Sequence, residues 1–314
     1  MTAARTPLEP DALRLGGNPA RWWLATRPAF LTITLGGVLL GMAHAAPAMA
    51  QAWPQALLAT VLALLAHAAV NVINDVADHH NGTDAANTAR VFPFTGGSRF
   101  IQNGVLDASQ MALLAQALTA AVILGGCVLV WHGGIWLLGI GFIGVSLGWA
   151  YSTPPLRLNS RGLGELTVLT CFLLLPQGMQ VVLSGRPDGG LVWLSLPFAL
   201  LTTAILYINQ FPDREADALA GKRHWVVRLS LAAAVAGYGL LILLAYACLM
   251  VAVALGKLPS ACLAALLTAP LSVFALVRLH RDAASPAQLR PALAATIAAA
   301  NLSPLLLGLG YLVG

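Results

Sequence analysis

Residues 54–78 read PQALLATVLALLAHAAVNVINDVAD, an apolar run that ends in a cluster of amide and acidic residues. The apolar part is long enough to cross a bilayer as a helix, for which about 20 residues are needed. Its end carries the pattern Asn71-Val-Ile-Asn74-Asp75-Val-Ala-Asp78. Positions i, i+4 and i+7 share one face of a helix, so Asn71, Asp75 and Asp78 are predicted to point in one direction.

A second copy of this pattern ends another apolar segment and reads Asn209-Gln-Phe-Pro-Asp213-Arg-Glu-Ala-Asp217. In each copy an Asn precedes an Asp by four residues, and a further Asp follows three or four residues later. Carboxylates at helix C-termini are repelled by the helix dipole and by one another, so the two patterns predict a bound multivalent cation. Ligand sets made of oxygen alone favour Mg²⁺, which commonly binds phosphate groups as well.

The composition is that of an integral membrane protein. The chain is 58% hydrophobic and 9% charged, with a mean hydropathy of +0.79, whereas soluble domains are about 25% charged. Its apolar stretches are continuous, which indicates helices and not the alternating strands of a membrane barrel. No basic stripe or soluble module is present to bind nucleic acid. The four cysteines fall in apolar segments without the spacing of a metal site, and we interpret them as packing residues.

The apolar stretches predict an all-α integral membrane protein with about nine transmembrane helices. They cover residues 29–49, 54–74, 109–131, 134–151, 164–184, 190–209, 229–254, 260–279 and 291–312. Residues 1–28 are expected to form a cytoplasmic N-terminal tail, and residues 29–314 a single membrane domain. The two acidic patterns end the second and sixth spans, which predicts two four-helix repeats in parallel orientation plus one helix.

Basic residues predict the orientation. Of the 17 Lys and Arg residues, 15 lie on one side of the membrane, in the N-terminal tail, in loops or, for Arg278, at the end of a span; Arg186 and Lys257 are the other two. Because such residues accumulate on the cytoplasmic side, the N-terminus and both acidic patterns are predicted to be cytoplasmic. The loops 75–108 and 210–228, which follow the two patterns, are then cytoplasmic too.

Further candidates lie on the same side of the membrane, in its loops or at the end of a span, and each has two interpretations. Arg99, Arg157, Lys222 and Arg223 could bind phosphate oxygens or could be topogenic charges at the membrane surface. The turn Thr95-Gly-Gly-Ser-Arg99 could cradle an anion or be a plain turn. Tyr151 could stabilise a cation with its ring face or anchor its helix at the interface. His79, His80 and His224 are expected at the surface.

These motifs together resemble the UbiA superfamily of intramembrane prenyltransferases. The stretches that carry the resemblance are Asn71–Asp84, Gly96–Arg99, Tyr151–Arg157 with Arg161–Glu165, and Asn209–Arg223, and it extends over nearly the whole chain. Within that superfamily the chain is most similar to the 1,4-dihydroxy-2-naphthoate polyprenyltransferases of menaquinone synthesis. The ND-x-x-D-x-x-x-G-x-D form at Asn74–Asp84 suggests this subgroup.

The resemblance implies Mg²⁺-dependent transfer of a prenyl group from a polyprenyl diphosphate to an aromatic acceptor. It also implies that the enzyme is embedded in the lipid of a bacterial inner membrane, with its active site facing the cytoplasm. Asp84 would be a further ligand or would orient the loop. The implied catalytic residues are Asp75, Asp78, Asp213, Asp217 and Tyr151; the metal ligands are Asn71, Asp75, Asp78, Asn209, Asp213 and Asp217; the diphosphate-binding residues are Asn71, Asn74, Arg99, Arg157, Lys222 and Arg223.

Three alternatives compete with this interpretation. The acceptor could be 4-hydroxybenzoate or another ring or lipid. A cation-coupled transporter would also use acidic residues, but it would place them near the middle of the membrane, whereas here they gather at one face. A CDP-alcohol phosphatidyltransferase would require Gly directly after the second Asp of its motif, and here Asp78 is followed by His79.

Overall fold

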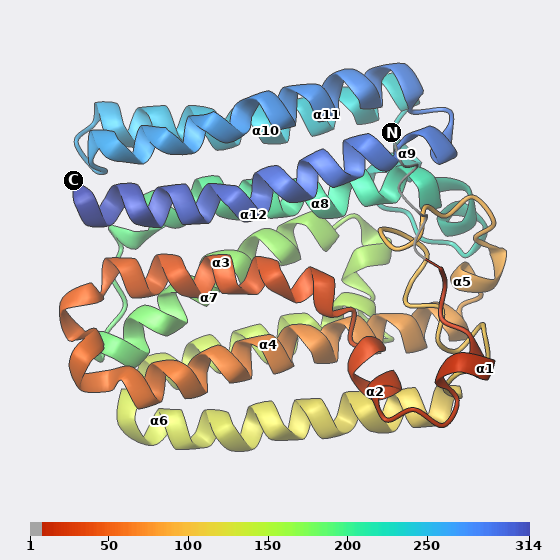
Figure 1. Cartoon of the computed structure of the whole chain (residues 1–314), viewed down its shortest axis with the longest axis horizontal. Coiled ribbons are helices and arrows are strands. Elements are labelled where there is room, and N and C mark those ends of the chain that lie inside the picture. The colour runs from red at the N-terminus through yellow and green to blue at the C-terminus, as the bar shows by residue number, and fades with distance from the viewer. Residues whose placement is uncertain (1–7) are drawn as a thin grey trace.

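The computed structural model describes residues 8–314, so residues 1–7 of the predicted tail lie outside the described part. Within that part, helices are the regular secondary structure, and the long ones lie side by side as a bundle (Figure 1). The long helices are α3 (Pro28–His44), α4 (Met49–His80), α6 (Ala108–Ser152), α7 (Gly164–Ser184), α8 (Leu191–Leu219), α10 (Leu231–Ala254), α11 (Ala269–Asp282) and α12 (Arg290–Val313). The short ones include α1 (Ala12–Leu15), α2 (Ala20–Leu24), α5 (Thr83–Ala86) and α9 (Trp225–Arg228).

The all-α membrane architecture predicted from the sequence is confirmed. Eight helical segments in the described chain are long and apolar enough to cross a membrane, and α3, at 17 residues, is a shorter apolar helix. Helix α6 is interrupted at Gly134, whose φ of 67° is left-handed, and so divides into the segments Ala108–Trp131 and Gly133–Ser152. Glycine tolerates this backbone conformation because it has no Cβ. The number of helices that cross the membrane, the repeats and the orientation stay predictions.

Two helices continue beyond the residues at which the predicted spans end. The loops were expected to begin at residues 75 and 210, but α4 continues to His80 and α8 to Leu219. Hydropathy falls where the polar residues begin, yet a helical backbone satisfies its own hydrogen bonds whatever its side chains. Pro212 lies within α8 without ending it. Both acidic patterns are therefore helical throughout, as their spacing required.

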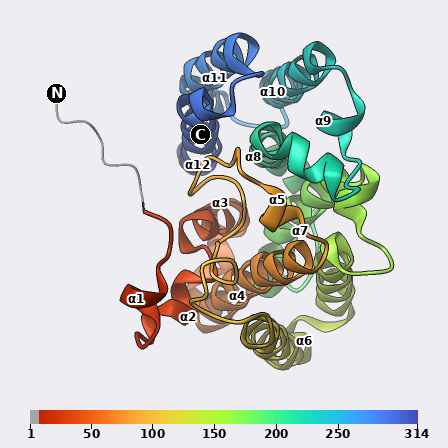
Figure 2. The same cartoon turned by 90° about the vertical axis from the view of Figure 1, so that its right-hand side faces the viewer.

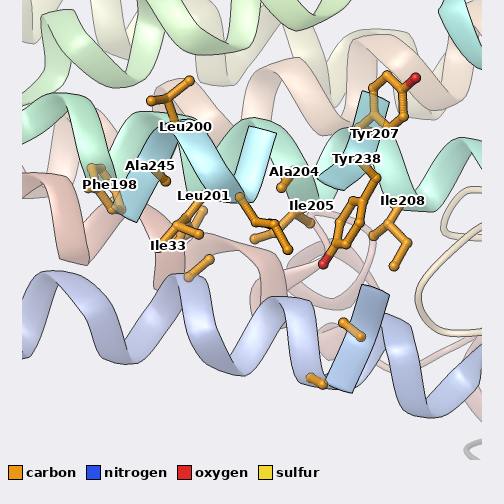
Figure 3. Packing of buried hydrophobic residues seen from close by; sticks show 14 of the residues in the cluster. Ile33, Phe198, Leu200, Leu201, Ala204, Ile205, Tyr207, Ile208, Tyr238 and Ala245 are labelled. Carbon is orange, nitrogen blue, oxygen red and sulfur yellow. The ribbon is translucent and has the colours of Figure 1, made fainter. Parts of the chain in front are cut away.

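Helix α8 is the most buried of the long helices and carries much of the core. Figure 3 shows its residues Phe198, Leu201 and Ile205 beside Ile33 of α3. Helix α3 approaches its neighbours closely because glycines face them. A Cβ at Gly36 would lie 2.6 Å from Pro304 Cγ of α12. Small residues at such contacts are the usual means of packing helices in a membrane, where the hydrophobic effect does not drive helix association.

The connecting segments that matter for function gather at one end of the bundle. Figure 2 views this end, where α1, α2, α5 and α9 lie around the ends of α4 and α8. The C-terminus lies at the opposite end (Figure 1). Since α4 and α8 both finish at the loop-rich end, the fold brings the two acidic patterns to the same end of the bundle.

Labelling of introduced cysteines tests the orientation of this end. His80→Cys and Ala218→Cys, both at exposed positions after the acidic patterns, should react with a membrane-impermeant maleimide only from the cytoplasmic side, because basic residues concentrate there. Lys257→Cys, exposed in the turn after α10, is the matched control and should react only from the other side. The unmodified protein gives the background from its own cysteines. Labelling of His80→Cys from outside contradicts the predicted orientation.

Candidate functional site

A cavity of about 790 Å³ lies among α3, α4, α6, α7 and α8. On α4 its lining runs from Ala59 to Asp78, which corresponds to roughly 28 Å at 1.5 Å per residue. This is close to the thickness of the hydrocarbon core of a bilayer. The cavity therefore extends along most of the bundle from the end where the acidic patterns lie.

The two halves of the cavity differ in chemistry. The half nearer the loops is lined by polar side chains, among them Asn71, Asn74, Asp78, Asp84, Asn87, Tyr151, Asn209, Asp213, Asp217, Lys222 and His224. The deeper half is lined by apolar side chains, among them Val38, Leu62, Leu129, Leu138, Phe142, Leu175 and Met179. Such a cavity can hold a molecule with a charged head and a long hydrocarbon tail.

Lys222 joins the two acidic patterns. Its Nζ lies 2.7 Å from Asp78 Oδ1 of α4 and 3.2 Å from Asp217 Oδ1 of α8, and all three side chains are buried. Burial alone lowers the pKa of Lys222, but the two carboxylates outweigh it and raise that pKa above its usual value. His224 Nε2 lies 3.0 Å from the other oxygen of Asp217. A cation thus already sits between the patterns, as their mutual repulsion requires.

Asp213 faces the loop that follows α4. Asn87 donates a hydrogen bond of 2.6 Å from Nδ2 to Asp213 Oδ1, and the Gly96 N–H donates to Oδ2 at 3.4 Å. Asp213 also lines the cavity. The loop therefore holds a carboxylate of the second pattern in place while leaving it at the cavity surface.

Asp75 lies beneath the same loop and does not line the cavity. Both of its oxygens lie within 3.3 Å of the Ser98 N–H, and Oδ1 lies 3.4 Å from the Arg27 guanidinium. Gly97 passes over this carboxylate with φ 75°, and a Cβ there would lie 3.1 Å from Asp75 Oδ1 and 2.8 Å from Asp84 Oδ2. Only glycine combines this conformation with so close an approach.

Asp84 is crowded by other carboxylates. Burial, together with the negative charges of Asp78 and Asp75, raises the pKa of Asp84 to about 8. Its Oδ2 accepts a hydrogen bond from Gln102 Nε2 at 3.1 Å. A cation placed at this end of the cavity would relieve the repulsion.

The structure separates the predicted site residues into two groups. Asn71, Asn74, Asp78, Tyr151, Asn209, Asp213, Asp217 and Lys222 line the cavity. The remaining predicted residues do not line the cavity; they are Asp75, Arg99, Arg157 and Arg223. Arg99 donates to the backbone oxygen of Asp84 at 2.6 Å, so it holds the loop. Arg157 and Arg223 are exposed.

Several residues at this end were not singled out from the sequence. Arg27 and Asn87 bind carboxylates of the two patterns but stand outside any motif. His224 was expected at the surface and is instead buried against Asp217, so that expectation was wrong; His79 and His80 are exposed as expected. The one available signal for His224 was its place two residues after Lys222.

The N-terminal segment at Glu9 and Pro10, called the strap below, is hydrogen-bonded to the loop between α4 and α6. Glu9 accepts a hydrogen bond of 2.7 Å from Arg90 Nε and another of 3.3 Å from Asn103. The Arg90 hydrogen bond is the main reason that the pKa of Glu9 lies below its usual value. Arg90 in turn donates to the backbone oxygen of Asn87, the residue that binds Asp213. A continuous series of contacts therefore leads from the strap to the second acidic pattern.

The donor atoms suit Mg²⁺ bound together with phosphate. Within residues 8–314 no three His, Cys, Asp or Glu side chains converge closely enough to form a metal site by themselves. Mg²⁺, however, usually takes one or two carboxylates and completes its shell with water and substrate phosphates. Asn87 Oδ1 and Asn209 Oδ1 are buried without a hydrogen-bond partner, and both residues line the cavity. Unpaired amide oxygens beside carboxylates fit a hard cation.

Comparison with known proteins identifies the family. Residues 31–312 match the UbiA prenyltransferase family. The chain belongs to this family. It is similar to the 1,4-dihydroxy-2-naphthoate octaprenyltransferase of Mycobacterium tuberculosis, at 31% identity covering 67% of this chain and 70% of the relative. The enzyme of the same name from Haemophilus influenzae is 28% identical and covers 66% and 68%. The protein is thus a membrane-embedded prenyltransferase.

Solved structures share the fold at low identity. A UbiA homolog from Aeropyrum pernix in its apo form superposes with a TM-score of 0.65 at 17% identity, covering 91% of this chain and 98% of that one. A UbiA homolog from Archaeoglobus fulgidus, bound to DMAPP and Mg²⁺, gives a TM-score of 0.56 at 14% identity, covering 93% and 98%. The helical architecture is therefore that of the UbiA prenyltransferases.

Replacement of Lys222 tests whether its ammonium offsets the carboxylates. Lys222→Met should lower the melting temperature of the metal-free protein, because Asp78 and Asp217 lose a buried partner; removal of one member of such a pair costs on the order of 3–5 kcal/mol. Arg223→Met, in the adjacent exposed residue, is the control and should melt like the wild type. Equal melting of both variants in detergent would show that Lys222 contributes no stability here.

Proposed function

We propose that this enzyme transfers a prenyl group from a polyprenyl diphosphate to 1,4-dihydroxy-2-naphthoate, with Mg²⁺ as its cofactor. The observation that carries the proposal is the divided cavity, in which both acidic patterns meet at one end and apolar side chains line the rest. The diphosphate occupies the acidic end and the isoprenoid chain the apolar end.

The diphosphate is bound by groups of both signs. Asp78, Asp84 and Asp213, with the free Asn209 Oδ1, would hold Mg²⁺, which when bound neutralises diphosphate oxygens and stabilises the charge that develops on them. Lys222 would stay close to the phosphate oxygens as a further positive charge. Asp75 would not bind the metal directly; it accepts a hydrogen bond from the Ser98 amide and so holds the loop in place.

The reaction proceeds through an allylic cation. The bond between the allylic carbon and the diphosphate oxygen breaks, and its electron pair leaves with the diphosphate. An electron-rich carbon of the acceptor ring attacks the cation, and then loses the group it carried, as a proton or as carbon dioxide, so that aromaticity returns. The ring of Tyr151 lies in the cavity wall and can stabilise the cation through its π face.

The reaction also requires that water be excluded from the site, since water would react with the allylic cation. The loop between α4 and α6 covers the acidic end, and its residues Thr95, Gly97 and Ser98 are buried. The strap built around Glu9 holds this loop down. A closed, dry site also strengthens each electrostatic interaction within it.

Two comparisons support the choice of substrates. The relatives from Mycobacterium tuberculosis and Haemophilus influenzae are 1,4-dihydroxy-2-naphthoate octaprenyltransferases. The structural relative from Archaeoglobus fulgidus was solved with DMAPP and Mg²⁺. Together with the excess of basic residues at the loops, these relatives support an enzyme of a bacterial inner membrane that works from the cytoplasmic side.

A transfer assay tests the proposal directly. The purified protein with Mg²⁺ and a radiolabelled polyprenyl diphosphate is offered 1,4-dihydroxy-2-naphthoate, 4-hydroxybenzoate and a lipid alcohol. Label should pass to the naphthoate, EDTA should abolish the transfer, and added Mg²⁺ should restore it. Transfer only to another acceptor contradicts the naphthoate assignment, and transfer that survives full chelation contradicts the role of Mg²⁺.

Substitution of a cavity carboxylate separates catalysis from folding. Asp213→Asn keeps the shape of the side chain and removes one negative charge, so kcat should fall by about 100-fold or more, as it does when other stabilisers of developing charge are removed. Asp107→Asn is the control: Asp107 caps α6 outside the cavity, and Asn caps helices equally well, so turnover should stay within a few-fold. Loss of folding without loss of activity per folded molecule would make Asp213 a structural residue.

A further inference from the structure

His67 is the deepest polar side chain that α4 contributes to the cavity. Together with Asn71, Asn74 and Asp78 it forms a stripe along one face of the helix, and all four residues line the cavity. The α4 residues that line it beyond His67 are Ala59, Leu62, Ala63 and Ala66. His67 therefore marks the boundary between the polar and the apolar half, roughly 16 Å along the helix from Asp78.

The orientation of His67 is fixed by Thr34 of α3. The Thr34 hydroxyl and His67 Nδ1 lie 2.7 Å apart. Other threonines in the long helices, such as Thr60, Thr119 and Thr202, donate to the backbone oxygen four residues earlier. Thr34 does not follow this pattern, and its hydroxyl is hydrogen-bonded to His67 of another helix.

This contact engages one of the two ring nitrogens and leaves the other available. Within the described chain the Thr34 hydroxyl bonds only to His67 Nδ1, and either group can be the donor, since Thr34 also borders the cavity. When the Thr34 hydroxyl donates to Nδ1, a neutral imidazole carries its proton on the other nitrogen, Nε2. Nε2 has no hydrogen-bond partner in residues 8–314, yet it is not enclosed by protein atoms, because the ring borders the cavity.

Aromatic packing holds the ring in place. The imidazole meets the ring of Phe172 edge-on, with centroids 6.0 Å apart, and Phe172 meets Phe198 in the same manner at 5.9 Å. An isolated polar group in an apolar membrane interior is costly, and such residues usually serve a substrate or an ion. His67 Nε2 is thus a polar atom in a fixed position that the described residues leave without a partner.

We propose that His67 binds the aromatic acceptor by donating a hydrogen bond from Nε2 to a ring oxygen, and so positions the ring against the allylic carbon. This inference rests on the proposed function. The isoprenoid chain offers no acceptor atom, and the diphosphate is held by the acidic end, so the oxygen of a hydroxylated or carboxylated ring is the group that matches this donor. Thr34 is a positioning residue, since it acts through the imidazole.

Steady-state kinetics with the Mg²⁺-loaded enzyme tests this assignment. His67→Phe keeps an aromatic ring beside Phe172 and removes the donor, so kcat/KM for the acceptor should fall about 10- to 100-fold, the range expected for one lost hydrogen bond in a buried site. KM for the prenyl diphosphate should stay within about two-fold, because its binding groups are untouched. His67→Gln, whose amide can place an N–H near Nε2, should recover a large part of the loss.

Threonine variants provide a matched pair. Thr34→Val keeps the shape of the side chain but no longer orients the imidazole, so it should raise KM for the acceptor in the same direction as His67→Phe, by less. Thr60→Val removes a hydroxyl from α4 that bonds only within its own helix and does not line the cavity, so the kinetic constants should not change.

The outcomes distinguish the two levels of the proposal. If wild-type enzyme transfers no prenyl group to any aromatic ring, the proposed function fails. If wild-type enzyme is active and His67→Phe leaves the acceptor constants unchanged, or raises both KM values equally, the role of His67 is refuted. Should His67→Phe fail to fold, the other two variants decide. An unchanged KM for the acceptor in Thr34→Val would refute the role of His67. The same holds if His67→Gln is no more active than other polar replacements at this position.

Discussion

Five buried or half-buried carboxylates share one end of this bundle, and the rest of the site is arranged around their repulsion. Asp75 is paired with Arg27, and Asp78 and Asp217 share Lys222. Asp213 receives an amide from Asn87, while Asp84 keeps a raised pKa. Each negative charge taken out of water must be matched by a positive charge or by hydrogen bonds, because an isolated buried ion is prohibitively unfavourable. The match is incomplete without a further cation, and the proposed Mg²⁺ with its diphosphate would supply that charge.

The loop after α4 couples this electrostatic problem to the rest of the chain. Its amides reach a carboxylate of each pattern, through Ser98 to Asp75 and through Gly96 to Asp213. Glu9 then ties the loop to the N-terminal strap by way of Arg90. A loop fixed at both patterns cannot move without disturbing both. Binding of a diphosphate between the patterns and closure of the site over it are therefore expected to be linked.

Much of this was predictable from the sequence, and the remainder depended on tertiary structure. Hydropathy identified the helices because membrane spans need long apolar runs, and the spacing of Asn71, Asp75 and Asp78 indicated a shared helix face. It could not indicate that Asp75 turns to the loop while Asp78 faces the cavity, since adjacent turns of one face can meet different neighbours. Arg27 and Asn87 carry no motif, and chain folding alone brings them to the carboxylates. His224 was misjudged because composition near a membrane surface does not reveal burial.

The helices α4 and α8 extend beyond their apolar segments, and this extension keeps the carboxylates of both patterns in fixed positions. Were the patterns in flexible loops, the carboxylates would separate to reduce their repulsion. On continuous helices they are held by the packing of the bundle, in which α8 is largely buried. Packing along the bundle therefore adds to Arg27 and Lys222 in holding the acids close to one another. The same helices carry the wall of the apolar half of the cavity, so the position of the charged head of a bound lipid and the path of its tail are set by the same rigid elements.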